Sequence, residues 1–208
     1  MAPMRDSTEP TPRDRLLAGA AVAAPALLLA STAAYVAGDG LGEDATGGAI
    51  QVWAAIALGL AVVGLTRELE PRLPRLAAAL SLTGMVGTAG ATAWAINAMV
   101  YAADPAAAVS EATGPEAGLA LFVPGIVLPL TLAAIGAATA RSGAGPRVPG
   151  ILLALGGLCF PVSRIGGIEP LALVADALIA GGMIPMGLAL LRRPRPVAVL
   201  RGAEAVAA

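Results

Sequence analysis

Long apolar runs separated by short polar segments dominate the pattern of hydrophobic and polar positions along the chain. Most of them match the ~20 residues that a helix needs to cross a hydrocarbon core of about 30 Å. The runs lie at about residues 16–37, 49–66, 76–102, 119–140, 148–162 and 171–191. This pattern predicts an all-α polytopic membrane protein, a bundle of six transmembrane helices.

The polar ends of the chain define the predicted domain limits. Residues 1–14 contain three prolines and mixed charge, which predicts a disordered tail because such a segment buries little apolar surface. Residues 15–192 form the predicted six-helix transmembrane domain, and residues 193–208 a short tail. The first run also fits a signal peptide cleaved near Ala37, although it exceeds the ~7 to 15 apolar residues usual for one.

The charged residues predict the orientation of the spans. All 13 basic residues are arginines, and 12 of them lie in the two tails and in the second and fourth loops. The first and third loops carry only acidic charges, and Arg164 is the only basic residue of the fifth. Because basic residues in short loops stay in the cytoplasm, we expect both termini to be cytoplasmic and the protein to lie in the cell (cytoplasmic) membrane. The arginine, alanine and glycine usage suggests a GC-rich, bacterial coding sequence.

The composition argues against several classes of function. Hydrophobic residues make up 57% of the chain and charged residues only 13%, and the mean hydropathy is +0.80. Soluble domains have fewer hydrophobic and more charged residues. There is no histidine and one cysteine, Cys159, so the sequence offers no imidazole ligand, internal disulfide or nucleophile with a matched base. We therefore predict no enzyme activity, no cofactor and no metal, and the scattered arginines predict no nucleic-acid partner.

The third run is the longest and has small residues at its centre. Gly84, Gly87 and Gly90 let another helix approach closely, which predicts a packing helix and is compatible with a homo-oligomer or a partner membrane subunit. Its length predicts that this helix tilts or protrudes from the bilayer.

Aromatic and polar residues share the predicted outer half of the spans. The six aromatic side chains there are typical of an interfacial belt. Gln51, Trp94 and Asn97 lie at a similar depth to Asp176, which is roughly 9 Å inside the last span at 1.5 Å per residue. A carboxylate at that depth should face the bundle interior or water, which makes Asp176 a candidate functional residue.

Arg164 is the expected partner of Asp176, and Glu169 competes for the same guanidinium. A pair between Arg164 and Asp176 would keep the carboxylate ionised and hold the fifth span to the sixth. Without that pair, burial would favour the protonated carboxyl, and Asp176 would be a candidate for proton exchange or for binding a cation.

Two functional hypotheses remain open on the sequence alone. The first is a small-solute or proton-coupled carrier, or the substrate-binding membrane subunit of one, with an outward-facing site formed by Asp176, Arg164, Asn97, Glu169, Trp94 and Gln51. The alternative is a non-transporting scaffold or a regulatory or assembly partner. In both cases the lipid bilayer is a partner, and in the first a small solute or a proton is another.

Overall fold

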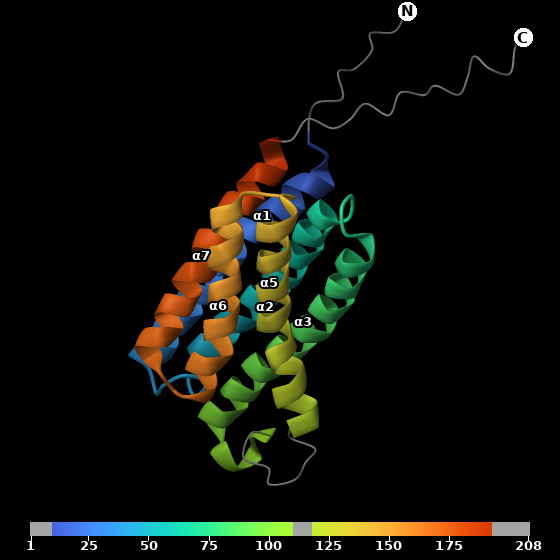
Figure 1. Ribbon diagram of the computed structural model, residues 1–208. Coiled ribbons are helices and arrows are strands. Elements are labelled where there is room, and N and C mark those ends of the chain that lie inside the picture. Colours follow the sequence, from blue (N-terminus) through green and yellow to red (C-terminus); the bar gives the residue numbers. More distant parts are fainter. Residues whose placement is uncertain (1–9, 110–117, 193–208) are drawn as a thin grey trace, which may run out of the picture.

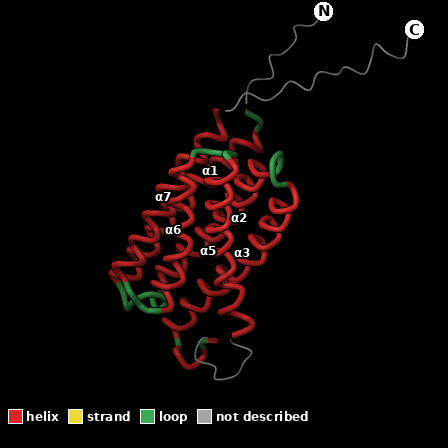
Figure 2. The backbone as a smooth tube through the Cα atoms, viewed as in Figure 1, coloured by secondary structure: helices red, strands yellow, loops and turns green. Residues whose placement is uncertain are grey.

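The computed structural model describes residues 10–109 and 118–192, and this part of the chain is all-helical (Figures 1 and 2). Six of its helices are long and apolar enough to cross a membrane, which confirms the predicted all-helical class and the predicted number of helices of spanning length. The helices are α1 (Pro12–Ala37), α2 (Ala45–Leu69), α3 (Pro74–Ala103), η1 (Pro105–Ala107), η3 (Gly118–Phe122), α5 (Val123–Ser142), α6 (Arg147–Ile165) and α7 (Glu169–Arg192). The predicted C-terminal tail and residues 1–9 lie outside the described residues.

The first helix begins earlier than its hydropathy predicts, so residues 12–14 of the predicted tail are helical. The Thr11 side chain accepts a hydrogen bond from the Asp14 backbone, and the Asp14 side chain accepts one from the Thr11 backbone. This capping box, with Pro12 at the first helical position, stabilises a helix start within a polar segment. Hydropathy alone does not detect such a start.

The predicted fourth span consists of two parts. Residues Gly118–Phe122 form a π-helical turn, and the α-helix proper begins at Val123. Pro124 lies at this junction and has no backbone N–H to donate to the preceding turn. A wider turn at such a position is an expected response to the lost hydrogen bond.

The six long helices form a closed ring. Each packs against the next in the sequence, and α7 returns to pack against α1. The start of α1 and the end of α7 therefore lie at the same end of the bundle (Figure 1). Helices from the two ends of the sequence thus become neighbours, which brings residues of α1 next to residues of α6 and α7.

Small residues allow the close contacts between α3 and its neighbour α5, as the sequence predicted. A Cβ added at Gly87 would come within 2.4 Å of the Leu128 backbone, and one at Gly90 within 2.2 Å of the Pro124 carbonyl carbon. The same packing recurs between α5 and α6, where Gly136 and Gly150 face each other. These three helices approach more closely than larger side chains would permit.

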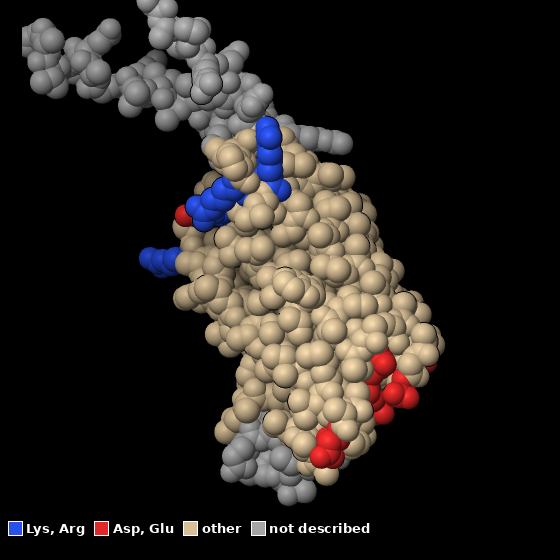
Figure 3. Space-filling model, turned by 180° about the vertical axis from the view of Figure 1, so that it is seen from behind, with Lys and Arg blue, Asp and Glu red and all other residues tan. Residues whose placement is uncertain are grey.

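Charges are segregated between the two ends of the bundle. In the described chain, the exposed arginines gather near the end that carries the start of α1, and the opposite end carries acidic residues (Figure 3). The acidic end comprises Asp39, Glu43, Asp44, Asp104 and Glu169. The arrangement agrees with the sequence pattern on which the predicted orientation rests.

Candidate functional site

Arg164 lies inside the bundle rather than in a loop. Helix α6 continues beyond its purely apolar part to Ile165 and ends at Gly166, followed by Gly167 in the left-handed conformation (φ 62°). The Arg164 side chain is only 11% exposed. An arginine at this depth requires partners for its charge.

Asp176 of α7 provides the countercharge. Arg164 Nη2 lies 3.3 Å from Asp176 Oδ2, and the Asp176 side chain is completely buried. The structure thus selects Asp176, not Glu169, from the two carboxylates that the sequence left as alternatives. The pair joins α6 to α7, the arrangement for which we expected a structural role.

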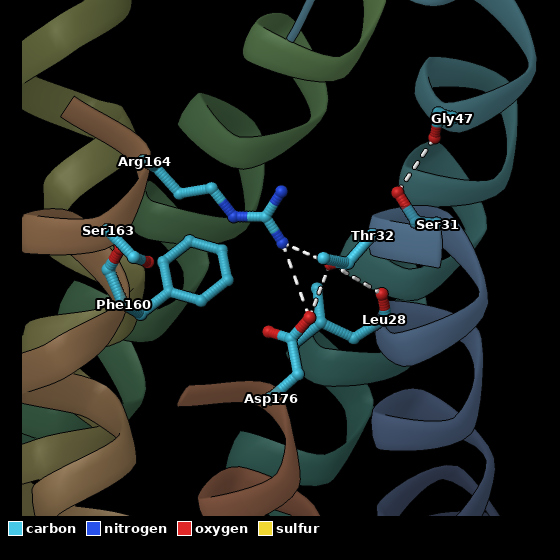
Figure 4. Close-up of polar contacts among 8 residues, drawn as sticks. All are labelled: Leu28, Ser31, Thr32, Gly47, Phe160, Ser163, Arg164 and Asp176. Atoms are coloured by element: carbon cyan, nitrogen blue, oxygen red, sulfur yellow. Dashed lines mark hydrogen bonds and ion pairs between the residues drawn. The ribbon is translucent and has the colours of Figure 1, made fainter. Parts of the chain in front are cut away.

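Thr32 of α1 completes this cluster, and the sequence analysis did not identify it. Its hydroxyl donates to Asp176 Oδ2 and accepts from Arg164 Nη2, and the Leu28 carbonyl lies 3.1 Å away as a second acceptor (Figure 4). Ser31 and Thr32 are adjacent hydroxyl residues in an otherwise apolar stretch, which was the available signal. Through Thr32, three helices share one polar cluster.

Two aromatic rings flank the guanidinium. Its Cζ lies 4.9 Å from the centroid of the Phe160 ring and 5.9 Å from that of Tyr35, within the range of cation–π attraction. Tyr35 is fully buried, so the prediction that all six aromatics form an interfacial belt is wrong for this residue. Trp53, at 66% exposed, has the surface position that a belt requires.

The remaining predicted site residues separate into two groups. Gln51 and Trp94 line the same partly open cavity as Arg164, and Trp94 also packs edge-on against Phe122 with ring centroids 5.1 Å apart. Asn97 is buried at 7% exposure but lies outside the lining of this cavity, as do Asp176 and Glu169. Of the predicted site residues, Gln51, Trp94 and Arg164 thus share a cavity, and Arg164 also pairs with Asp176. Asn97 and Glu169 belong to neither arrangement.

The cavity has a volume of about 190 Å³. Each of the six long helices contributes to its wall. Representatives from α1, α2, α3, α5, α6 and α7 in turn are Leu28, Gln51, Ala91, Gly125, Phe160 and Ile179. It lies on the side of the bundle that carries the acidic end, because Gln51 follows the start of α2 and Arg164 precedes the end of α6.

Several polar atoms at this level have no hydrogen-bond partner among the described residues. Gln51 Oε1 and Arg164 Nε belong to residues of the cavity wall, and Asp176 Oδ1 and the Tyr35 hydroxyl belong to the adjoining cluster. Buried polar atoms are nearly always paired, so these atoms are exceptions, and each is buried out of reach of a molecule in the cavity.

The arrangement can bind a small molecule, because the cavity is lined mainly by apolar side chains with a few polar ones. The described residues contain no group of three His, Cys, Asp or Glu side chains placed to hold a metal ion. The Asp176 carboxylate is held in an ion pair with Arg164. The cavity wall is apolar except for the side chains of Gln51, Trp94 and Arg164.

Comparison with known proteins adds no assignment. No family model matches the chain, and neither the curated proteins nor the solved structures include a significant match. The fold and site therefore define the class: an all-helical chain with six candidate membrane-spanning helices and a cavity inside the bundle.

Proposed function

We propose that this protein is a multi-pass protein of the cytoplasmic membrane that binds a small solute within its bundle, as a carrier or as the substrate-binding subunit of one. The observation that carries this proposal is the cavity to which all six long helices contribute. Ligand sites in helical bundles lie between the helices, and relative movement of the helices would change access to such a cavity. Both termini are proposed to be cytoplasmic, and in that orientation the cavity would lie in the outer half of the membrane.

The solute is proposed to contact Gln51 and Arg164 rather than Asp176. Gln51 and Arg164 are polar residues of the cavity wall. Asp176 is outside the lining and is bound to Arg164 and Thr32. Its role in this proposal is to fix the guanidinium, so that coupling to a proton at Asp176 is not needed.

Thiol labelling from the outer side tests the proposal. Gly125 lines the cavity, and a Cβ there would meet no atom within 4 Å, so Gly125→Cys in a Cys159→Ala background should fold. We expect a membrane-impermeant maleimide to label this variant in intact cells. Gly19→Cys is the matched control, because its Cβ is also unobstructed but lies near the opposite end of the bundle; it should stay unlabelled.

Failure of Gly125→Cys to label, in protein shown to be folded and inserted, would contradict an outward-opening cavity. A scaffold or assembly partner would then be the better proposal. The observation that favours this second candidate is the cluster of Thr32, Arg164 and Asp176, which ties α1, α6 and α7 together as a purely structural element would.

A further inference from the structure

The position of its mouth and the length of the cavity restrict the kind of solute that it holds. Resting on the proposed function, we infer that the solute is an amphiphile with an unbranched alkyl chain. The chain enters the cavity from the outer leaflet, between α5 and α6, and the polar head stays at the mouth. This ligand class goes beyond solute binding alone, because it defines both a chemistry and a route of entry.

The mouth of the cavity lies where η3 meets α5 and where α6 ends. Lining residues from α1, α2 and α7 are sealed inside the bundle, since Leu28, Ala55 and Ile179 are at most 2% exposed. Phe122 and Ile165 also line the cavity but are 37% and 67% exposed. In Figure 1, α5 and α6 diverge toward these ends. The cavity therefore opens between α5 and α6.

Helix contacts close the neighbouring routes. Helix α3 touches α5 at this level, because a Cβ at Gly90 would lie 2.2 Å from the Pro124 carbonyl carbon. Helices α5 and α6 touch farther inward, where a Cβ at Gly157 would lie 2.5 Å from the Pro129 carbonyl oxygen. At Gly125, about one turn outward along α5, an added Cβ would meet no atom within 4 Å. The separation of α5 from α6 thus lies outward of Pro129.

The surface around the mouth is apolar. Leu158 and Val162 continue the exposed face of α6 inward from Ile165, and Val123 is exposed at the start of α5. On helices that cross a membrane, such faces contact lipid chains. Ile165 is also the last residue of α6, so in the proposed orientation the mouth lies at the outer edge of the span. An amphiphile there can keep its head at the interface and insert its chain.

The cavity has the length that a chain requires. Its lining on η3 and α5 extends from Phe122 to Leu132, about 15 Å of helix at 1.5 Å per residue. The lining on α2 extends from Gln51 to Leu58, about 10 Å. A volume of about 190 Å³ spread over this length forms a slot rather than a sphere. By comparison with a cavity of about 150 Å³ that binds benzene, it holds roughly seven or eight carbon atoms.

The inner wall favours hydrocarbon over water. Inward of Gln51 the lining is apolar and includes Ala55, Leu58, Leu128, Leu132 and Ile179. Apolar cavities stay dry, and an empty one loses the dispersion contacts of its wall. A bound alkyl chain restores these contacts without displacing hydrogen-bonded water. Because this inner lining has no polar side chain, the polar head is confined to the mouth.

Quenching of Trp94 by brominated chains tests the inference. Trp94 lies in the cavity wall and the other tryptophan, Trp53, is 66% exposed, so Trp53→Phe leaves Trp94 as the only indole. We would reconstitute this variant in nanodiscs and titrate it with stearate brominated at mid-chain, because bromine quenches an indole only at close range. Bromoadamantane is the compact apolar probe. In a third arm, phosphatidylcholine with a brominated chain is varied in the nanodisc.

We expect saturable quenching of Trp94 by the brominated stearate, at an affinity at least about tenfold above that of bromoadamantane, whose rigid cage overpacks a slot. Gly125→Leu and Ala91→Leu add side-chain atoms at two positions of the lining. Each should weaken binding at least about tenfold in folded protein, because the added atoms take the space of about three methylene groups. Ala79→Leu is the matched control on α3 and should change nothing, because Ala79 is exposed and outside the lining.

The outcomes separate the source of the chain and the two proposals. Saturable quenching by the brominated phosphatidylcholine alone, lost in both cavity-filled variants, would support the alkyl chain and identify a bilayer lipid as its source. Equal or tighter binding of bromoadamantane would overturn the alkyl-chain class while supporting a solute-binding cavity. Saturable quenching by a chain that survives both cavity-filling substitutions would also overturn the class. Linear quenching by every probe, equal in the filled variants, would overturn both proposals.

Discussion

At the scale of single residues, the best-defined feature is the ion pair of Arg164 and Asp176. The aspartate is completely buried and the arginine almost so. Such a pair adds little stability compared with apolar residues of the same size, but removing one partner leaves a buried charge without compensation. The folded protein therefore tolerates the loss of both charges better than the loss of one.

Asp176→Asn should destabilise the folded protein strongly. Loss of one partner of a buried pair costs about 3–5 kcal/mol, and we expect a correspondingly lower midpoint of thermal unfolding in detergent. The double substitution Arg164→Met with Asp176→Leu should recover most of this loss. Glu169→Gln at the start of α7 is the control and should have little effect; an unchanged midpoint in Asp176→Asn would show that the pair does not form.

Thr32 allows a finer test of the same cluster. Thr32→Val keeps the shape of the side chain but removes the hydroxyl that contacts both charged groups, and should cost about 1–2 kcal/mol of unfolding free energy. Thr32→Ser keeps the hydroxyl and should lose less. The same unfolding assay measures both variants, and equal losses would argue that the methyl group, not the hydroxyl, is what matters.

At the scale of the elements, close helix packing depends on glycine at the seams. Helix α3 lies against α5 at a distance that Gly87 and Gly90 permit, because a Cβ at either position would overlap the α5 backbone. Backbone atoms cannot move aside as the end of a flexible side chain can. A larger residue at either position would therefore force α3 and α5 apart.

Gly90→Ala should reduce stability even though alanine favours a helix. The added Cβ would lie 2.2 Å from the Pro124 carbonyl carbon, and overpacking of this kind costs about 1–3 kcal/mol or more. Gly19→Ala is the matched control, because its Cβ would meet nothing within 4 Å; it should be neutral or slightly stabilising. Equal midpoints for the two variants in thermal unfolding would contradict a tight seam between α3 and α5.

Helix α3 also illustrates how length affects the shape of the molecule. Its 30 residues give about 45 Å of helix, against a hydrocarbon core of about 30 Å. In Figure 1 its lower end, with the π-helical turn before α5, extends beyond the loops that join α1 to α2 and α6 to α7. The prediction that this helix tilts or protrudes is consistent with that shape.

At the scale of the whole molecule, the separation of charges predicts how the bundle sits in the bilayer. Asp39, in the loop between α1 and α2, and Arg72, in the loop between α2 and α3, are both exposed. The two loops lie at opposite ends of the helical bundle. With both termini in the cytoplasm, Asp39→Cys in a Cys159→Ala background should react with an impermeant maleimide in intact cells. Arg72→Cys should react only after the membrane is permeabilised, and the reverse pattern would show the opposite orientation.

What the sequence by itself determined is the architecture along the chain: the all-helical class, six helices long and apolar enough to cross a membrane, and the placement of charges at their ends. These properties depend on local hydropathy and on each residue's position relative to its own helix. The sequence analysis missed the helix start at Pro12 and the π-helical turn before α5, because these features depend on capping and backbone hydrogen bonds and hydropathy does not report them.

The tertiary structure decided which polar residues meet. Arg164 and Asp176 lie only 12 positions apart and were the expected partners, with Glu169 as a competitor for the guanidinium. The helix geometry places Asp176 beside the guanidinium. Thr32 joins them from 132 positions before Arg164, because α7 and α6 come to lie near α1 when the ring closes. The cavity at Gln51 likewise exists only when six helices are packed together, since its volume is the space that their side chains leave unfilled.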